Sequence, residues 1–247
     1  MAAQPKYELG MEELTSPGTL RASFAEMVAT ALFVFIGVGA VIVLQAGGGI
    51  VGVAIAHGLA IAVLVASIGA ISGGHINPAV SFAMVITGRI SITRGVMYVI
   101  AQLVGAAIGM ALLRGFLLDS VVTEVSGAGG HAVNREVLTN LGGVGVEAVL
   151  TFVLVWVIFA TAVSSRGLGS MAAFAIGFAV LIDHFVGVPL TGASMNPART
   201  FGPALINDRW DEHWVYWAGP LIGAAAAAIT YYVLYLADEE RAAPTTA

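Results

Sequence analysis

The triplet Asn-Pro-Ala occurs twice in this sequence, within Ser72–Val80 (SGGHINPAV) and within Gly192–Ala204 (GASMNPARTFGPA). Asn is favoured just before a helix and Pro in its first turn, because the first N–H groups of a helix have no partner within it. Each triplet therefore predicts a helix start at its Asn. The apolar stretches that follow, Asn77–Ile86 and Asn196–Ile206, span about 10 residues or roughly 15 Å of helix. That length crosses only half of a bilayer's hydrocarbon core.

Six longer apolar stretches surround the two triplets. A membrane-spanning helix needs about 20 mainly apolar residues, and six stretches meet this requirement: Leu20–Leu44, Ile50–Ile71, Arg94–Leu117, Leu141–Val163, Gly169–Pro189 and His213–Leu236. The composition agrees, since 58% of the 247 residues are hydrophobic and only 10% are charged, whereas soluble domains carry about 25% charged residues. The first stretch is too long for a cleaved signal peptide and has no short basic lead. We therefore predict an all-α membrane protein with six transmembrane helices.

The two halves of the chain repeat each other. Asn77–Ala79 aligns with Asn196–Ala198, 119 positions later, and Glu26 with its following Thr30 aligns with Glu147 and Thr151. Each half holds three spans, an odd number, so the second half must enter the membrane from the opposite side. The short helices then dip in from opposite faces, and their N-termini should meet near the midplane. The expected fold is six transmembrane helices plus two re-entrant half-helices in an inverted repeat.

The domain organisation and orientation follow from the spans. We expect one transmembrane domain over residues 20–236, with repeat one over about 20–117 and repeat two over about 141–236. Cytoplasmic tails should flank it over residues 1–19 and 237–247, within which Met1–Pro17 and Asp238–Ala247 are expected to be mobile. Six spans place both termini on one side, which holds most of the basic residues: Lys6, Arg21, Arg89, Arg94, Arg166 and Arg241. Basic loops are retained in the cytoplasm, so both termini are predicted to be cytoplasmic.

Several function classes are disfavoured by the composition. The chain has no Cys and a formal net charge of −5, which removes disulfide and thiol chemistry and disfavours nucleic-acid binding. No nucleophile–base constellation or metal-ligand set is evident. We therefore expect no catalytic residue, no metal, no cofactor and no nucleic-acid partner.

Two carboxyl groups are expected within the membrane. Glu26 and Glu147 fall inside the first and fourth spans, where an ionisable group costs roughly 2.5–3.5 kcal/mol on insertion scales and needs partners. They could relay protons or couple ions in a transporter, or they could accept hydrogen bonds from loop N–H groups. Their symmetric placement favours loop support. His75 is likewise interpreted as a residue that braces its loop, with a role at the cytoplasmic side of a lumen as the alternative.

Packing and anchoring roles are expected for two further groups of residues. Gly105-x-x-x-Gly109 and Gly219-x-x-x-Gly223 are small-residue faces that permit close helix crossing. The aromatic residues near predicted span ends are typical of membrane-interface anchors: Tyr98, Trp156, Trp210, Trp214 and Trp217.

At this level of detail the sequence resembles the aquaporin (major intrinsic protein) family over about residues 20–236. The resemblance rests on the two stretches around Pro78 and Pro197 quoted above. Ala56-His57-Gly58 and Leu20-Arg21-Ala22 are similar to plant tonoplast intrinsic proteins in particular. The resemblance implies six tilted helices, two half-helices, one pore per subunit and a homotetramer. The cell membrane is the expected location, or the vacuolar membrane if the source is a plant.

The resemblance also implies a selectivity filter on the extracellular side of the two Asn residues. Its four positions correspond to His57, His184, Ala193 and Arg199. A His-and-Arg set is typical of water-selective members, whereas glycerol facilitators pair aromatic with small residues. His184 departs from the usual tonoplast pattern and favours water.

Two neighbours of this filter are ambiguous. His131 resembles a loop histidine that lies against the filter arginine, although it could instead be an exposed loop residue. Asp183, next to His184, could face a neighbouring helix or make the filter pH-sensitive.

The sequence thus predicts a passive water channel that excludes ions and protons. The Asn77 and Asn196 amides would orient a central water, and the converging helix dipoles and Arg199 would repel cations. The expected partners are water and the lipid bilayer. A facilitator of ammonia, hydrogen peroxide or glycerol is an alternative, as is an inverted-repeat secondary transporter. A junction or adhesion protein with a vestigial pore is a more distant one.

Overall fold

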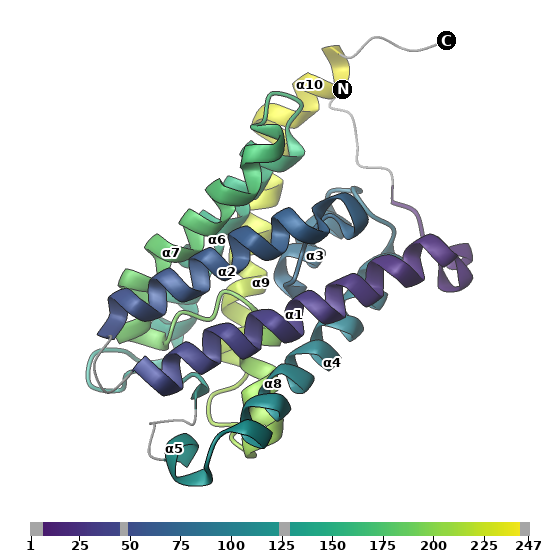
Figure 1. Cartoon of the computed structure of the whole chain (residues 1–247). Helices are drawn as coiled ribbons and strands as arrows, with labels where there is room; N and C mark the ends of the chain where they lie inside the picture. The colour runs from purple at the N-terminus through teal and green to yellow at the C-terminus, as the bar shows by residue number, and fades with distance from the viewer. Residues whose placement is uncertain (1–6, 45–48, 124–128, 243–247) are drawn as a thin grey trace.

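The computed structural model describes residues 7–44, 49–123 and 129–242, and within these every regular element is helical. The long helices are α1 (Pro17–Leu44), α2 (Gly49–Ser72), α4 (Ile92–Phe116), α6 (Asn140–Ile158), α7 (Ala172–Thr191) and α9 (Val215–Tyr231). Two shorter helices, α3 (Pro78–Ile86) and α8 (Pro197–Asn207), follow the Asn-Pro-Ala triplets. The minor elements are η1 (Met11–Thr15), α5 (Asp119–Thr123), η3 (Phe159–Val163), η4 (Gly169–Met171), η5 (Tyr232–Leu236) and α10 (Ala237–Ala242). The expected all-α fold class is confirmed (Figure 1).

Among the described residues, six helical stretches are long and apolar enough to cross a membrane: Pro17–Leu44, Gly49–Ser72, Ile92–Phe116, Asn140–Val163, Gly169–Thr191 and Val215–Glu239. Each overlaps one of the six spans expected from the sequence, with ends that differ by a few residues. The first begins at Pro17 rather than Leu20, because Pro is well suited to a helix's first turn.

Each half contains an equivalent pair of packed helices, and a third pair joins the two halves. α1 packs against α4 and α6 against α9, while α2 and α7 pack against each other across the repeat. A Cβ added at Gly105 would overlap the carbonyl oxygen of Met27, and one at Gly223 would overlap that of Ala148. These crossings are so close that only glycine fits at the contact, as small-residue faces permit.

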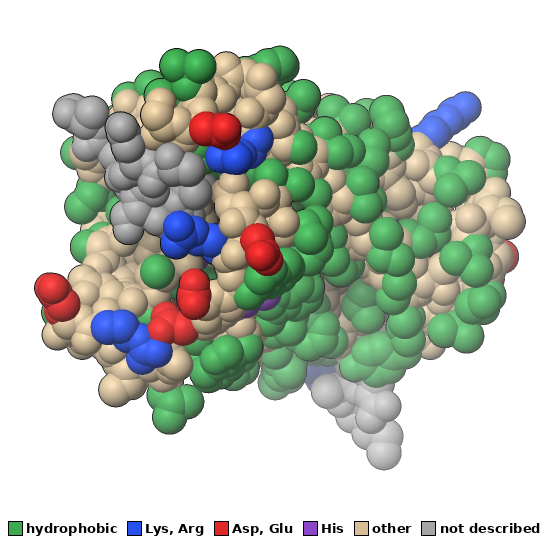
Figure 2. All heavy atoms as spheres, turned by 90° about the horizontal axis from the view of Figure 1, so that it is seen from below, with side chains coloured by type: hydrophobic (Ala, Val, Ile, Leu, Met, Phe, Trp, Pro, Cys, Tyr) green, Lys and Arg blue, Asp and Glu red, His purple; other side chains and the backbone are tan. Residues whose placement is uncertain are grey.

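The outward faces of the bundle are apolar. Each long helix exposes large hydrophobic side chains, for example Phe24, Val63, Val104, Val149, Ile182 and Ile229. Figure 2 shows such side chains in a broad band over the visible face, with most of the acidic and basic groups towards one end. Exposed apolar surface of this extent indicates contact with lipid. The chain is therefore an integral, multi-pass membrane protein.

The segment before α1 is not the mobile tail that its polarity suggested. The Tyr7 hydroxyl donates to the carbonyl of Ile86 at the end of α3 (3.1 Å), and Arg94 Nε donates to Glu13 at the start of α4 (2.6 Å). The backbone of residues 8–9 also accepts two hydrogen bonds from the first turn of α4. That expectation was therefore wrong for residues 7–16, which are docked against the first half-helix. Residues 1–6 and 243–247 lie outside the described residues.

Candidate functional site: a pore between two half-helices

The two half-helices meet tip to tip through their Asn residues. Asn77 Nδ2 donates to the carbonyl of Met195 (2.8 Å), and Asn196 Nδ2 donates to the carbonyl of Ile76 (2.9 Å). These bonds join residues 118 and 120 positions apart in the chain. The two triplets therefore lie at one place in the molecule, and each holds the loop that leads into the other.

Each Asn also caps its own helix. Asn77 Oδ1 accepts from Ala79 N (2.8 Å), while Asn196 Oδ1 accepts from Ala198 N (3.0 Å) and Arg199 N (3.3 Å). With the oxygen so engaged, the amide group must point away from its own helix. Both helix N-termini, which carry partial positive charge, thus face the same region. Pro78, Ala79, Pro197 and Ala198 form the first turns and are buried.

The loop residues before each Asn have an unusual backbone. Ile76 and Met195 have φ of 55° and 52°, a left-handed conformation that is a genuine outlier for a β-branched residue such as Ile. Such strain persists only where surrounding structure fixes it.

Two buried carboxylates supply that support. Glu26 accepts the backbone N–H groups of His75 (2.9 Å) and Ile76 (2.6 Å), and Glu147 accepts those of Ser194 (2.9 Å) and Met195 (2.7 Å). Both glutamates have no exposed surface. Within this geometry they bind loop N–H groups, which is the supporting arrangement weighed from the sequence.

Several polar residues that bind these two glutamates were not predicted from the sequence. Ser72 and Thr191 donate hydroxyls to Glu26 and Glu147, both at 2.6 Å. Gln102 Nε2 donates to Glu26 (2.9 Å) and to a hydroxyl at Ser81. The 119-residue offset pairs Ser72 with Thr191, so this signal was available in the sequence.

Tyr98 was expected at the membrane interface, and this was wrong. It is buried, and its hydroxyl donates to the carbonyl of Ser72 (3.0 Å). Tyr216 repeats the contact with the carbonyl of Thr191 (2.9 Å). Ser72 and Thr191 are the last residues of α2 and α7, where backbone carbonyls have no partner within the helix. The two tyrosine hydroxyls supply the missing hydrogen-bond donors.

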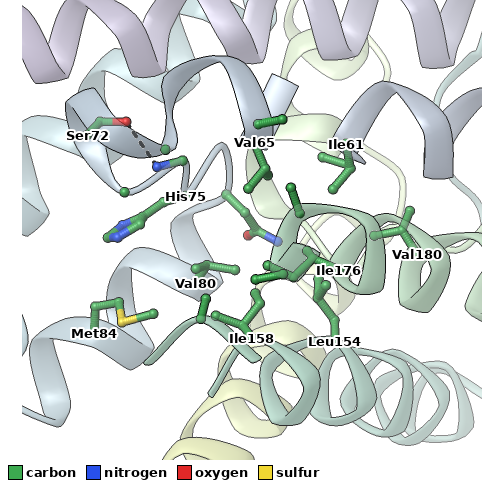
Figure 3. Close-up of a pocket in the computed structure, with 18 of the residues that line it drawn as sticks. Ile61, Val65, Ser72, His75, Val80, Met84, Leu154, Ile158, Ile176 and Val180 are labelled. Atoms are coloured by element: carbon green, nitrogen blue, oxygen red, sulfur yellow. Dashed lines mark hydrogen bonds between the residues drawn. The ribbon is translucent and has the colours of Figure 1, made fainter. Parts of the chain in front are cut away.

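A cavity of about 680 Å³ leads to the meeting point of the two half-helices. Its outer residues include Arg89 and Ser170, and its inner residues include Asn77, Asn196 and His184. Figure 3 shows that most of its wall is apolar, with His75 on one side and the labelled side chains Ile61, Val65, Val80, Leu154, Ile158, Ile176 and Val180 around it. His75 both lines this cavity and braces its loop, since its Nδ1 pairs with Ser81 Oγ at 3.0 Å.

Beyond the inner end of the cavity lies a narrow polar constriction. The His57 and His184 rings are 4.3 Å apart between centroids, and Arg199 Nε donates to His57 Nε2 (3.3 Å). Both Nδ1 atoms face helix carbonyls, those of Val53 and Val180. A carbonyl can only accept, so Nδ1 carries the proton and Nε2 of a neutral ring is an acceptor.

The remaining expected filter positions lie on the second re-entrant loop and its surroundings. Ala193 is buried, and any side chain at Gly187 would overlap it. Arg199 is buried and also donates to the carbonyl of Gly129 (3.0 Å). The structure thus brings His57, His184 and Arg199 together, with Ala193 on the loop beside the Asn196 triplet.

The loop histidine His131 contacts this loop directly. Its Nδ1 pairs with Thr200 Oγ1 (2.8 Å), and a Cβ at Gly192 would meet its ring at 2.6 Å. Burial, and then the charge of Arg199, hold the pKa of His131 well below its usual value. His131 therefore packs against the residue that follows Arg199, in its neutral form.

Asp183 does not pair with its neighbour His184. It is buried in α7, and its Oδ2 has no hydrogen-bond partner among the described residues. The described part of the chain also shows no group of three or more His, Asp or Glu residues able to hold a metal ion.

Comparisons with known proteins agree with this geometry. The family model of the major intrinsic protein family matches residues 13–231. Aquaporin TIP4-4 of Zea mays is 45% identical over 243 residues, covering 94% of each chain. Probable aquaporin TIP3-2 of Arabidopsis thaliana is 42% identical over 246 residues, covering 93% of this chain and 90% of that protein. Aquaporin-4 of Mus musculus is 45% identical over 229 residues, covering 89% of this chain and 69% of that protein.

A solved structure shares the fold. The X-ray structure of the aquaglyceroporin from Plasmodium falciparum superposes with a TM-score of 0.78 at 22% identity, covering 90% of this chain and 99% of that one. The resemblance drawn from the two Asn-Pro-Ala stretches is thereby confirmed. This chain belongs to the major intrinsic protein family, as an aquaporin similar to the plant TIP proteins.

Proposed function

We propose that this protein is a passive water channel that conducts water along osmotic gradients and excludes ions and protons. The observation that carries the proposal is the reciprocal pairing of Asn77 and Asn196 at the inner end of the cavity. It is supported by aquaporin relatives with 42–45% identity over most of the chain.

The water path runs through the cavity, past the two Asn amides and along the constriction beside His184 and Arg199. Each Asn amide has two N–H groups, of which one bonds the opposite loop. The second N–H donates to a passing water, so the water at this point accepts two hydrogen bonds and directs its own hydrogens outward. That orientation interrupts a continuous chain of proton transfer.

Charge exclusion rests on three sources of positive potential. The N-termini of α3 and α8 carry partial positive charge at their meeting point, and Arg199 adds a full charge at the constriction. A cation that enters must also give up its hydration in a narrow site. Neutral water meets none of these barriers.

The filter set His57, His184, Ala193 and Arg199 favours water over glycerol. The Nε2 acceptor of His184 and the guanidinium donors of Arg199 line the constriction, so a small molecule that both donates and accepts can exchange hydrogen bonds along it. Glycerol is wider and presents a carbon backbone that needs an apolar face. His131 stabilises the side of the filter formed by the second loop.

The assembly and location are proposed on the family resemblance. The functional unit is a homotetramer with one pore per subunit, and both termini face the cytoplasm. The membrane is the cell membrane, or the vacuolar membrane in a plant cell.

Stopped-flow measurement on proteoliposomes tests the function. Water, glycerol and ammonia permeabilities are compared with those of empty vesicles of the same lipid. The proposal expects a large increase for water and little for glycerol. A glycerol increase equal to that for water would make the protein a general solute facilitator, and a saturable, ion-coupled flux would make it a transporter.

A further inference from the structure

A second cavity, of about 300 Å³, lies where α6 ends and α9 continues into α10. It shares no lining residue with the pore cavity. Figure 1 shows α10 beside the end of α6 at one tip of the molecule. The spans Asn140–Val163 and Val215–Glu239 both end here, so the cavity lies at the boundary between the apolar belt and the polar surface. In a bilayer this is the level of the lipid headgroups.

Both helices that form the cavity widen at this point. η3 (Phe159–Val163) and η5 (Tyr232–Leu236) are π-helical turns that continue α6 and α9. The equivalent helices of the first half, α1 and α4, remain α-helical to their described ends. The inverted repeat therefore does not require these turns, and π-helical turns are frequent at functional sites.

One wall of the cavity is aromatic. Tyr231 and Tyr235 line it, with ring centroids 4.9 Å apart. Trp156 packs edge-on behind both rings, at 5.1 Å and 6.0 Å. Tyr235 is 46% exposed, so its ring is available to a molecule that arrives from the membrane. Such ring faces attract cations, and in particular ammonium groups.

The cavity also carries charges of both signs. Arg166, Asp238 and Glu239 line the cavity. Glu239 is fixed by the hydroxyl of Ser164 (2.8 Å) and by the backbone and hydroxyl of Ser165 (2.9 and 2.8 Å). Asp238 pairs with Arg241. The guanidinium of Arg166 is exposed and forms no hydrogen bond with the residues that the structure describes, and its charge interacts with that of the nearby Glu239.

We propose that this cavity binds the headgroup of a zwitterionic phospholipid. The ammonium group lies against Tyr231, Tyr235 and the carboxylates, and the phosphate bonds to Arg166. A headgroup with a phosphate but no ammonium would place no cation against the aromatic wall or Glu239, whereas Asp238 already pairs with Arg241. A cavity that offers a guanidinium together with carboxylates and aromatic faces therefore fits a zwitterion better than an anionic lipid.

Native mass spectrometry of the full-length protein tests this site. Protein in neutral detergent is mixed with equimolar phosphatidylcholine, phosphatidylethanolamine and phosphatidylglycerol of identical acyl chains, and the lipid retained per chain is identified. The site predicts one retained lipid, with the two ammonium-bearing lipids preferred over phosphatidylglycerol by about fivefold.

Two variants on different elements separate the site from general lipid adhesion. Arg166→Gln removes the phosphate contact and should lower the retention of all three lipids, since each carries a phosphate. Tyr235→Leu removes a ring of the ammonium side and should abolish the preference. Arg114→Gln, a partly exposed arginine outside the cavity, is the matched control and should retain it. Unchanged thermal unfolding and water permeability show that the variants are folded. Equal retention of phosphatidylglycerol by the wild type, total lipid retention in Arg166→Gln equal to that of Arg114→Gln, or an unchanged preference in Tyr235→Leu would overturn the proposal.

Discussion

Asn77 and Asn196 bind each other's loops rather than each other. The amide of each donates to the carbonyl that directly precedes the other, at 2.8 and 2.9 Å. The two half-helices are therefore held tip to tip by a pair of bonds related by the pseudo-two-fold symmetry of the repeat. Each Asn caps its own helix, binds the opposite loop and keeps one N–H group directed towards the lumen. No substitution at these two positions is therefore expected to be neutral.

Two glycines of α4, Gly105 and Gly115, test how closely α4 crosses α1. Gly105→Ala would force a Cβ onto the carbonyl of Met27, whereas Gly115→Ala would meet nothing within 4 Å. We expect Gly105→Ala to destabilise the protein by about 1–3 kcal/mol. Gly115→Ala should stabilise it by roughly 0.5–1 kcal/mol.

Thermal unfolding in detergent measures both changes. Equal effects of Gly105→Ala and Gly115→Ala would show that α1 and α4 do not cross as closely as the structure has them.

The buried carboxylates should matter for stability more than for selectivity. Glu147→Gln replaces one acceptor oxygen with an amide that faces the N–H groups of the second loop. Because buried donors then lack partners, we expect a loss of about 3 kcal/mol. Glu136→Gln, at a solvent-exposed glutamate, is the control and should change stability by less than about 0.5 kcal/mol. An unfolding temperature of Glu147→Gln equal to that of the control would contradict the supporting role.

His131 predicts a pH dependence of stability. Its pKa is lowered in the folded state by burial and by the charge of Arg199, so the unfolded chain binds the proton more readily. Stability should therefore fall as the pH drops through the ordinary histidine pKa of about 6.5. His131→Asn should lose less stability than the wild type between about pH 7.5 and pH 5.

The difference between the wild type and His131→Asn isolates this residue from the other histidines. Parallel curves for the two proteins over that range would show that His131 does not pack beside the filter.

The histidine pair predicts how the filter discriminates solutes. His184→Ala removes one of two rings that lie 4.3 Å apart between centroids and opens an apolar face. We expect the ratio of glycerol to water permeability to rise about tenfold. His213→Ala, outside the constriction, is the control. If the ratio stays at the wild-type value in His184→Ala, the constriction lies elsewhere.

The half-helices and their support could be predicted from the sequence because the signals are local or repeated. Asn77 and Pro78 specify a helix start by capping chemistry alone, and the matching pair at Asn196 and Pro197 requires the inverted arrangement. Glu26 and Glu147 were informative because a carboxyl group in an apolar span must have partners.

The cross-links between the loops could not be predicted in this way. They depend on the left-handed backbone of Ile76 and Met195, which neither residue favours. Tyr98 was misplaced because hydropathy does not show which side of a helix faces the protein. The repeat that aligns Tyr98 with Tyr216 could have indicated a shared role.

The docked segment before α1 was missed for a different reason. Its polar composition is typical of a tail, but its contacts with Ile86 and Arg94 are long-range and leave no periodic pattern.

Proton leak and water flux, measured on the same reconstituted vesicles, test the central claim most directly. The wild type should raise water permeability well above that of empty vesicles and leave the proton leak unchanged. Asn196→Asp cannot donate to Ile76 and places a negative charge where the helix dipoles meet, so it should admit protons or cations. Asn140→Asp, in the first turn of α6, is the control and should behave as the wild type. Wild-type water flux at the level of empty vesicles, or an Asn196→Asp leak equal to that of the control, would contradict the account.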